Sequence, residues 1–311
     1  MSDTHLPNDP SWPRAAHWFV PVASAQASEP ADVGLLGVPA WRSSITPTGA
    51  HATPAAVRDA LLRCSTYAAS REIDLASLRA IDFGDVADPD GENGEARTGA
   101  AVAAAARSAR LLIAVGGDNS IAYSVMRGLA GDDLSGFGLI TLDAHHDLRD
   151  GVSNGSPVRR LIEAGLPGAN VVQIGIADFA NSAAYAQRAR DLGITVVPRA
   201  ALRRQSPAEA AREALALAGA GGRAVYVDID VDVCDRAIAP GCPSAVPGGL
   251  AADELREFAF ELAADPRVRA IDITEVDATS DALDQRTVRL AALLVLEAAA
   301  GYAARGGAGF N

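Results

Sequence analysis

Short apolar runs recur along this chain and alternate with longer segments of mixed character. Each run is bounded by glycine, proline or acidic residues, which is typical of a strand that is buried on both faces of a sheet. We expect these strands within residues 33–38, 80–83, 111–115, 137–142, 170–174, 194–197, 224–227 and 268–273.

Helices are expected between these strands. Thr53 is a potential N-cap and Pro54 suits a first helical position, so we expect a helix to begin there. Alternating short buried strands and helices predict an α/β fold, a three-layer αβα sandwich around a central, mostly parallel sheet. The other expected helices cover residues 96–110, 120–129, 157–165, 181–191, 207–217, 252–263 and 285–304.

The beginning of the chain lacks this alternation. Residues 1–30 are rich in Pro, Ser, Ala and Asp, which predicts an arm or an extension that lies on the surface. Residues 31–311 contain no internal repeat and no linker. We therefore expect one domain preceded by an N-terminal arm.

Two of the expected strands end in rows of acidic and imidazole side chains. These are Asp143, His145 and Asp147 after one strand, and Asp228 and Asp230, with Asp232 continuing the row, after the other. Side chains two apart on an extended strand share a side, and functional residues of parallel sheets lie beyond the carboxyl ends of the strands. Such anionic clusters need a cation between them, and this mixture of ligands suits manganese, iron or zinc.

Composition narrows the range of partners. The net charge of −12 argues against nucleic acid or an anionic membrane. All 27 basic residues are arginine, which excludes lysine Schiff-base chemistry and a Walker-type phosphate loop. The three cysteines give no disulfide framework, and no signal peptide or long apolar segment is evident, so we expect a soluble, cytoplasmic protein.

The motifs resemble those of the ureohydrolase family, which includes arginase, agmatinase, guanidino-acid hydrolases and formimidoylglutamase. Residues 116–120 are similar to the family's Gly-Gly-Asp-His-Ser, residues 143–147 match its Asp-Ala-His-x-Asp, and residues 228–235 match its second metal motif. Glu275 matches the glutamate that grips the amidino group. The resemblance begins near residue 33 and implies an arginase-like fold, a small amidine or guanidino substrate, and a homo-oligomer, trimeric or hexameric.

The resemblance also implies two Mn²⁺ ions per chain and a role for each ligand. Asp143 and Asp228 would bridge the ions, Asp147 would bind one of them, and His145 and Asp230 would bind the other. A hydroxide bridging such ions would attack the substrate, and Asp147 would take its proton.

The chain departs from the family pattern at two asparagines. Asn119 stands where the family has its first histidine ligand. An amide oxygen is the weaker ligand, so the ion on that side would be loosely held, or Asn119 would instead cap the following helix. Asn154 stands where many agmatinases carry a histidine, so a histidine proton shuttle is absent.

The loop after the first acidic row favours an acidic substrate. Arg149 and Arg159 lie at its two ends, and a guanidinium binds both oxygens of a carboxylate, although either arginine could form an internal ion pair instead. The loop itself looks like that of formimidoylglutamase. The expected substrate-binding residues are Arg149, Asn154, Ser156, Arg159 and Glu275, and the expected catalytic residues are Asp147 and Glu275.

Three hypotheses of function follow. The favoured one is a metal-dependent hydrolase of a linear amidine, converting N-formimidoyl-L-glutamate to L-glutamate and formamide in histidine breakdown. The second is a guanidino-acid hydrolase or agmatinase that releases urea, although the arginines of the loop disfavour the cationic tail of agmatine. The third, supported only by Asn119, is a metal-depleted binding protein without turnover.

Overall fold

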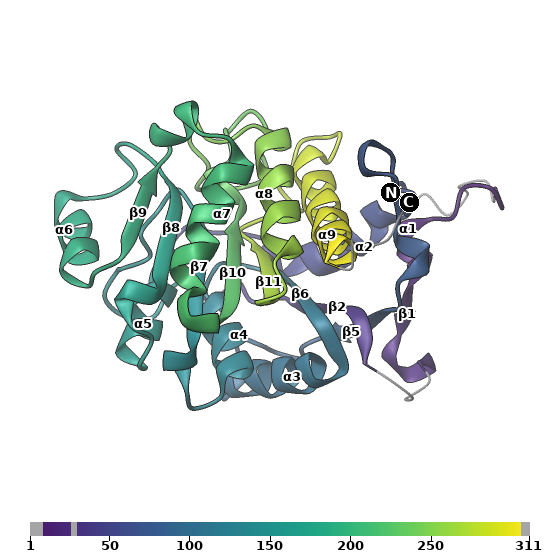
Figure 1. Ribbon diagram of the computed structural model, residues 1–311, viewed down its shortest axis with the longest axis horizontal. Coiled ribbons are helices and arrows are strands. Elements are labelled where there is room, and N and C mark those ends of the chain that lie inside the picture. The colour runs from purple at the N-terminus through teal and green to yellow at the C-terminus, as the bar shows by residue number, and fades with distance from the viewer. Residues whose placement is uncertain (1–8, 26–29, 306–311) are drawn as a thin grey trace.

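The computed structural model describes residues 9–25 and 30–305, and these form a three-layer αβα fold (Figure 1). The central sheet has nine strands in the order β1-β5-β2-β6-β11-β10-β7-β8-β9, and all neighbours in it pair in parallel. The strands are β1 (Phe19–Pro21), β2 (Ala31–Val38), β5 (Ala80–Asp85), β6 (Ala109–Gly116), β7 (Phe137–Leu142), β8 (Val171–Ile176), β9 (Thr195–Pro198), β10 (Ala224–Asp230) and β11 (Val268–Thr274).

Helices cover both faces of the sheet, which confirms the predicted fold class (Figure 1). Aliphatic side chains of the helices and strands form a core on each face, because the central strands of the sheet bury side chains on both sides. One face carries α2 (Thr53–Leu61), α7 (Pro207–Ala218), α8 (Ala252–Ala264) and α9 (Arg286–Ala304), and the other carries α3 (Gly94–Ser108), α4 (Ile121–Ala130), α5 (Pro157–Glu163) and α6 (Ala183–Asp191).

Local signals explain some helix starts but not others. Helix α7 begins with a complete capping box, in which Ser206 and Glu209 satisfy each other's backbone N–H groups. The N-cap expected at Thr53 is wrong, because Ala52 occupies that position and Thr53 lies inside α2. The Thr53 hydroxyl instead donates to the carbonyl of Val276, so it ties α2 to the loop after β11.

The N-terminal extension, in its described part, joins the sheet. A helical turn, α1 (Ala15–Trp18), leads into β1, where Phe19 pairs with Ala80 of β5. The Trp18 indole donates to the carbonyl of Leu78 at 2.9 Å. A three-residue edge strand is too short to show periodicity, so the sequence pattern did not reveal it. A second small feature, the hairpin of β3 (Tyr67–Ala68) and β4 (Ile73–Asp74), escaped prediction for the same reason.

Helix α9 is long and apolar enough, by composition alone, to cross a membrane. However, 61% of its apolar window is buried inside the fold. It packs beside α8 on one face of the sheet (Figure 1), which is the position of a core helix.

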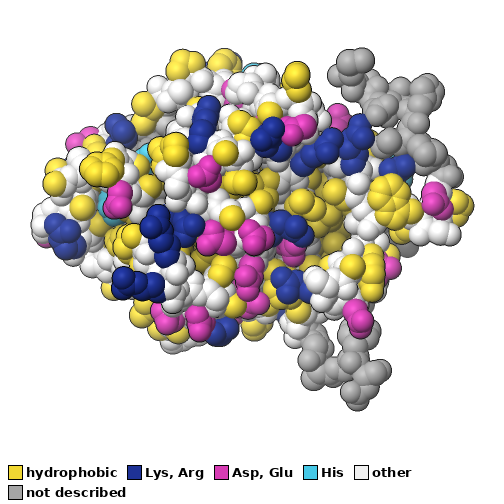
Figure 2. Space-filling view, turned by 90° about the horizontal axis from the view of Figure 1, so that it is seen from above, with side chains coloured by type: hydrophobic (Ala, Val, Ile, Leu, Met, Phe, Trp, Pro, Cys, Tyr) yellow, Lys and Arg dark blue, Asp and Glu magenta, His cyan; other side chains and the backbone are white. Residues whose placement is uncertain are grey.

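Charge is interspersed over the surface. On the face shown in Figure 2, arginine side chains stand beside acidic ones instead of forming a separate patch. Ion pairs between described residues include Arg256 with Glu297, at 2.6 Å, and Arg160 with Glu95, at 2.7 Å. The acidic net charge therefore does not create a field of a single sign on the face shown.

The strand order places four loops together at the carboxyl edge of the sheet. Strands β6, β11, β10 and β7 are consecutive neighbours, and the loops that follow them contain all the acidic motifs found in the sequence. Because parallel strands end at the same edge, residues far apart in the chain meet there.

Close packing beneath this edge depends on a glycine in β7. A Cβ on Gly138 would lie 2.2 Å from the carbonyl oxygen of Ala218 in α7, whereas a Cβ on Gly136 would meet nothing nearer than 3.6 Å. We expect Gly138→Ala to destabilise the fold by about 1–3 kcal/mol, the usual cost of overpacking. The matched Gly136→Ala should change stability by about 0.5 kcal/mol or less. Urea unfolding measures both, and equal effects would contradict the packing argument.

Candidate active site

The chain turns in the same way at the ends of β7 and β10. The Asp143 carboxylate accepts the N–H of His145 at 2.5 Å, and the Asp230 carboxylate accepts the N–H of Asp232 at 2.8 Å. These are Asx turns, in which a side chain bends the backbone back on itself. The first acidic row therefore does not continue an extended strand, because β7 ends at Leu142, before Asp143. In the second row Asp228 and Asp230 do lie on the extended strand β10, but the strand ends at Asp230, so Asp232 lies beyond it.

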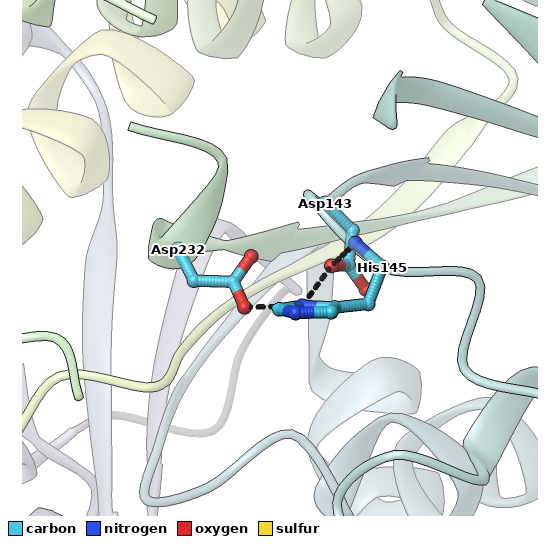
Figure 3. A group of neighbouring side chains, drawn as sticks. All are labelled: Asp143, His145 and Asp232. Atoms are coloured by element: carbon cyan, nitrogen blue, oxygen red, sulfur yellow. Dashed lines mark hydrogen bonds and ion pairs between the residues drawn. The ribbon is translucent and has the colours of Figure 1, made fainter. Parts of the chain in front are cut away.

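The two turns bring three potential metal ligands to one point. One ligand atom each of Asp143, His145 and Asp232 lies within 4.8 Å of the others. The imidazole lies between the two carboxylates (Figure 3), with Nδ1 at 2.7 Å from Asp232 and 3.5 Å from Asp143. Both carboxylates are buried. Two buried carboxylates and an imidazole around one point form a ligand set suited to a divalent cation.

Strand register decides which of the aspartates after β10 reach this point. Asp228 pairs with Thr141 of β7 and with Asp272 of β11, one row below the carboxyl edge. Ile229 pairs with Leu142, the last residue of β7, so Asp230 stands level with Asp143. The structure thus places Asp228 beneath the cluster.

Asp232, and not Asp228 as the motif resemblance implied, joins Asp143 and His145 in the cluster. From the sequence, Asp232 was expected only to continue the acidic row. The signal that identifies it is the two-residue spacing from Asp230, which repeats the spacing from Asp143 to His145.

Burial dominates the electrostatics of the cluster. It raises the pKa of Asp143 and of Asp230 well above the usual range, and neighbouring carboxylates raise both further. Burial opposes protonation of His145, but the carboxylates of Asp232 and Asp143 outweigh it and raise the pKa of the imidazole to about 12. The groups thus retain protons that balance the buried negative charge, which is a task that a divalent cation can perform.

Asp147 and Asn119 form a second pair beside the cluster. Asp147 is buried, has a left-handed backbone with φ of 52°, and accepts a hydrogen bond from Asn119 Nδ2 at 2.7 Å. Burial raises the pKa of Asp147 to about 7. Asn119 Oδ1 accepts from the hydroxyl of Thr274 at 3.0 Å, so the amide nitrogen, which cannot ligate a metal, faces Asp147. The alternative role of Asn119 as an N-cap is absent, because Ser120 occupies that position.

Glu275 is held rigidly at the end of β11. Its Oε1 accepts the backbone N–H of Asn119 at 2.7 Å and the Asn154 amide at 2.9 Å. Its φ of 63° is left-handed, a strained conformation that often marks functional sites. Burial raises the pKa of Glu275 to about 8. Asn154 also accepts the N–H of Ile45 at 3.0 Å, so this asparagine joins Glu275 to the loop over the cavity.

A cavity of about 470 Å³ runs along this edge of the sheet. The acids that line it, Asp147, Asp230, Asp232 and Glu275, come from β7, β10, β11 and the loops after them. The β8–α6 segment contributes Asn181, Ser182 and Tyr185, which carry no negative charge.

Arg149 is the one arginine that lines the cavity within the described residues. The aliphatic part of its side chain lies over Gly155, where a Cβ would be 2.8 Å from Arg149 Cδ. Its guanidinium has no hydrogen-bond or ion-pair partner in the described part of the chain. Its charge opposes the effect of burial on the pKa of Asp147, and the guanidinium is available to bind an anion that enters the cavity.

Two of the expected substrate-binding residues have structural roles instead. Arg159 donates to the carbonyl oxygens of Arg149 at 2.6 Å and Gly151 at 2.5 Å, and forms an ion pair with Glu163. Ser156 donates to the carbonyl of Ser153 at 2.8 Å. Neither residue lines the cavity, and together they shape the loop that presents Arg149. The open alternative for Arg159, an internal ion pair, is the one that the structure supports.

The His146 imidazole contacts a side chain of β8 and is not part of the cluster. Its Nδ1 is 2.7 Å from Gln173 Oε1, and its backbone N–H donates to Asn181 at 3.0 Å. Asn181 also donates to the carbonyl of Ala144 at 2.9 Å, so it holds the backbone between the ligands. The sequence offered no signal for this role of Asn181.

Comparison with known proteins identifies the relatives of this chain. The model of the Arginase family matches residues 31–301. A formimidoylglutamase of Halalkalibacterium halodurans is 36% identical over 272 residues, covering 85% of each chain. The crystal structure of formimidoylglutamase from Bacillus subtilis superposes with a TM-score of 0.88 at 30% identity, covering 97% of this chain and 95% of that one. A Trypanosoma cruzi formiminoglutamase with Mn²⁺ gives a TM-score of 0.85 at 27% identity, covering 94% and 99%.

The raised pKa values predict how pH affects stability without metal. Carboxyl groups whose pKa rises on folding from 3.8 to about 7, such as Asp147 and Asp272, stabilise the fold at low pH. That stability is lost as pH rises toward the folded pKa, with a slope of about 1.4 kcal/mol per pH unit for each retained proton. His145, whose pKa is raised on folding, also loses its stabilising effect as pH rises above the usual pKa of histidine. His146, whose pKa is lowered, has the opposite effect on stability, which is limited to one proton.

We therefore expect protein in EDTA to unfold at lower urea concentration at about pH 7.5 than at about pH 5. Mn²⁺ should remove this loss by replacing the protons. Metal-free protein that is equally stable at both pH values would contradict this account of the buried acids.

Proposed function

The chain belongs to the arginase family, and from this premise we propose that it is a formimidoylglutamase, which hydrolyses N-formimidoyl-L-glutamate to L-glutamate and formamide. Membership follows from the family match over residues 31–301 and from the relatives above. The reaction would place the enzyme in histidine breakdown.

One observation carries the choice of substrate, namely the distribution of charge along the cavity. Four acidic residues line the cavity, namely Asp147, Asp230, Asp232 and Glu275, and they are suited to hold a cationic amidine carbon. Arg149 and the neutral residues of the β8–α6 segment line the same cavity. A planar cation joined to an acidic tail matches this arrangement. N-formimidoyl-L-glutamate has both parts.

The residues of the cluster fit a pair of divalent cations, and we propose Mn²⁺ because a related enzyme is known with that ion. Asp143, His145 and Asp232 would hold one ion, since their ligand atoms already converge. Asp147 and Asp230, with Asp143, would hold the other. Asp143 Oδ2 supports this, because it is buried and has no hydrogen-bond partner among the described residues. Bound ions would supply Lewis acidity and lower the pKa of water.

Glu275 would orient the substrate. Its carboxylate is fixed by two N–H donors and faces the cavity, so it can pair with the amidinium nitrogens without rearrangement. Water adds to the formimidoyl carbon, and the bond from that carbon to the glutamate nitrogen breaks. Asp147, whose pKa is raised to about 7, is suited to accept the proton of the water and pass it to the departing nitrogen.

A guanidino acid is the second candidate substrate, because it also combines a planar cation with a carboxylate. Agmatine fits less well, since its cationic tail would meet the Arg149 guanidinium. The homologues at 36% and 34% identity that bear the name formimidoylglutamase favour the first substrate.

A competition assay tests this proposal. Manganese-loaded protein is given N-formimidoyl-L-glutamate, 4-guanidinobutyrate, agmatine and arginine together, and products are followed by NMR. We expect formamide and glutamate to appear first. Urea as the first product would contradict the proposed substrate.

Arg149→Ala should lower kcat/KM for N-formimidoyl-L-glutamate by at least about 30-fold, because one partner of a close charge pair is lost. Turnover of agmatine should not fall. Arg190→Ala is the control, since the Arg190 side chain is exposed and donates hydrogen bonds to Gln187 of its own helix, outside the lining of the cavity. An equal loss of kcat/KM with acidic and cationic substrates would show that Arg149 does not recognise the substrate carboxylate.

Asn119→His should increase the affinity of the ion bound by Asp147, by about tenfold or more. An imidazole is a stronger ligand than an amide, and the amide nitrogen now faces that carboxylate. Calorimetric titration of metal-free protein with Mn²⁺ measures the change. Unaltered affinity would show that residue 119 does not contact the ion.

A further inference from the structure

We propose that the hydroxyl of Tyr185 binds the side-chain carboxylate of the substrate and thereby selects a dicarboxylate. This inference rests on the proposed function, because it concerns the part of the cavity that the acidic tail would occupy. It adds a specificity-determining residue for which the sequence offered no signal.

Tyr185 is placed to contact a ligand and has no competing partner. It lies in the first turn of α6 and lines the cavity together with Asn181 and Ser182. Its backbone N–H donates to the hydroxyl of Ser182 at 3.1 Å, which caps the helix and fixes the start of the side chain. The phenolic hydroxyl has no hydrogen-bond partner within the described part of the chain.

Arg188 couples Tyr185 to the loop that carries Arg149. Its guanidinium carbon lies 5.6 Å from the centre of the Tyr185 ring. The same guanidinium donates to the carbonyl of Leu148 at 2.6 Å and to Asp150 at 2.9 Å, the two residues that flank Arg149. Helix α6 and the Arg149 loop are therefore tied together, so Tyr185 and Arg149 line one cavity in a defined relation.

The connectivity of the substrate assigns one carboxylate to each residue. Arg149 follows Asp147 by two positions, so it lies near the reacting end of the cavity. The α-carboxylate is attached to the carbon that bears the reacting nitrogen and would pair with Arg149. The side-chain carboxylate extends farther and would reach Tyr185. A hydroxyl that donates to a carboxylate forms a charge-assisted hydrogen bond, which is stronger than a neutral one.

The test crosses one variant with two substrates. Manganese-loaded wild type and Tyr185→Phe are each given N-formimidoyl-L-glutamate and N-formimidoyl-L-2-aminobutyrate, which keeps the α-carboxylate and lacks the side-chain carboxylate. We expect Tyr185→Phe to lower kcat/KM for the glutamate derivative by about tenfold or more, mainly through KM. Turnover of the aminobutyrate derivative should not change.

Tyr123→Phe is the matched control. Tyr123 lies on α4, outside the substrate cavity, and carries a similar stacked arginine, with Arg160 at 3.8 Å from the ring centre. An equal loss on both substrates in Tyr185→Phe, or no loss on either, would overturn the assignment. If the wild-type protein turns over neither derivative, the proposed function itself is wrong. That result differs from an equal effect of Tyr185→Phe on both substrates, which would contradict only the role of Tyr185.

Discussion

Neutralisation of buried carboxylates is the constraint on which the rest of this structure depends. Asp143, Asp147, Asp230, Asp232 and Glu275 are all buried at one edge of the sheet. Isolated negative charges in such a place are very costly, so each needs a donor, a proton or a cation. Backbone N–H groups, asparagine amides and the His145 imidazole meet part of this demand. A pair of divalent ions would meet the remainder, and this links metal binding to stability as well as to chemistry.

The fold brings these neutralising groups together with short segments of the chain. Parallel strands end at a common edge of the sheet. In the Asx turns after β7 and β10, the carboxylate of one aspartate accepts the backbone N–H of the potential ligand two residues later and so fixes the position of that ligand. Residues outside the ligand set then hold the loops in place. Asn181 binds the backbone between ligands, Arg159 shapes the Arg149 loop, and Asn154 joins Glu275 to residues over the cavity.

The two asparagines distinguish this chain from the family pattern in related ways. Asn119 stands where the family pattern has a histidine, and Asn154 stands where many agmatinases have one. Both donate their amide hydrogens to carboxylates of the candidate site, Asp147 and Glu275. A neutral amide stabilises a carboxylate without titrating near neutral pH. The chain thus replaces two titratable groups by fixed donors, and this places the proton transfer on Asp147 in the proposed reaction.

The sequence by itself determined the layered α/β fold and the approximate position of the acidic edge. Strands that are buried on both faces appear as nearly continuous apolar runs, and parallel sheets have their functional residues beyond the carboxyl ends of the strands. The motif resemblance led to the family. Only the tertiary structure decided which residues meet, because strand register and turn geometry depend on partners distant in sequence. Register places Asp230 beside Asp143 and Asp228 below it, and a turn returns Asp232 to the cluster. Likewise, Arg149 and Arg159 look equivalent in the sequence, but backbone carbonyls engage one guanidinium and leave the other facing the cavity.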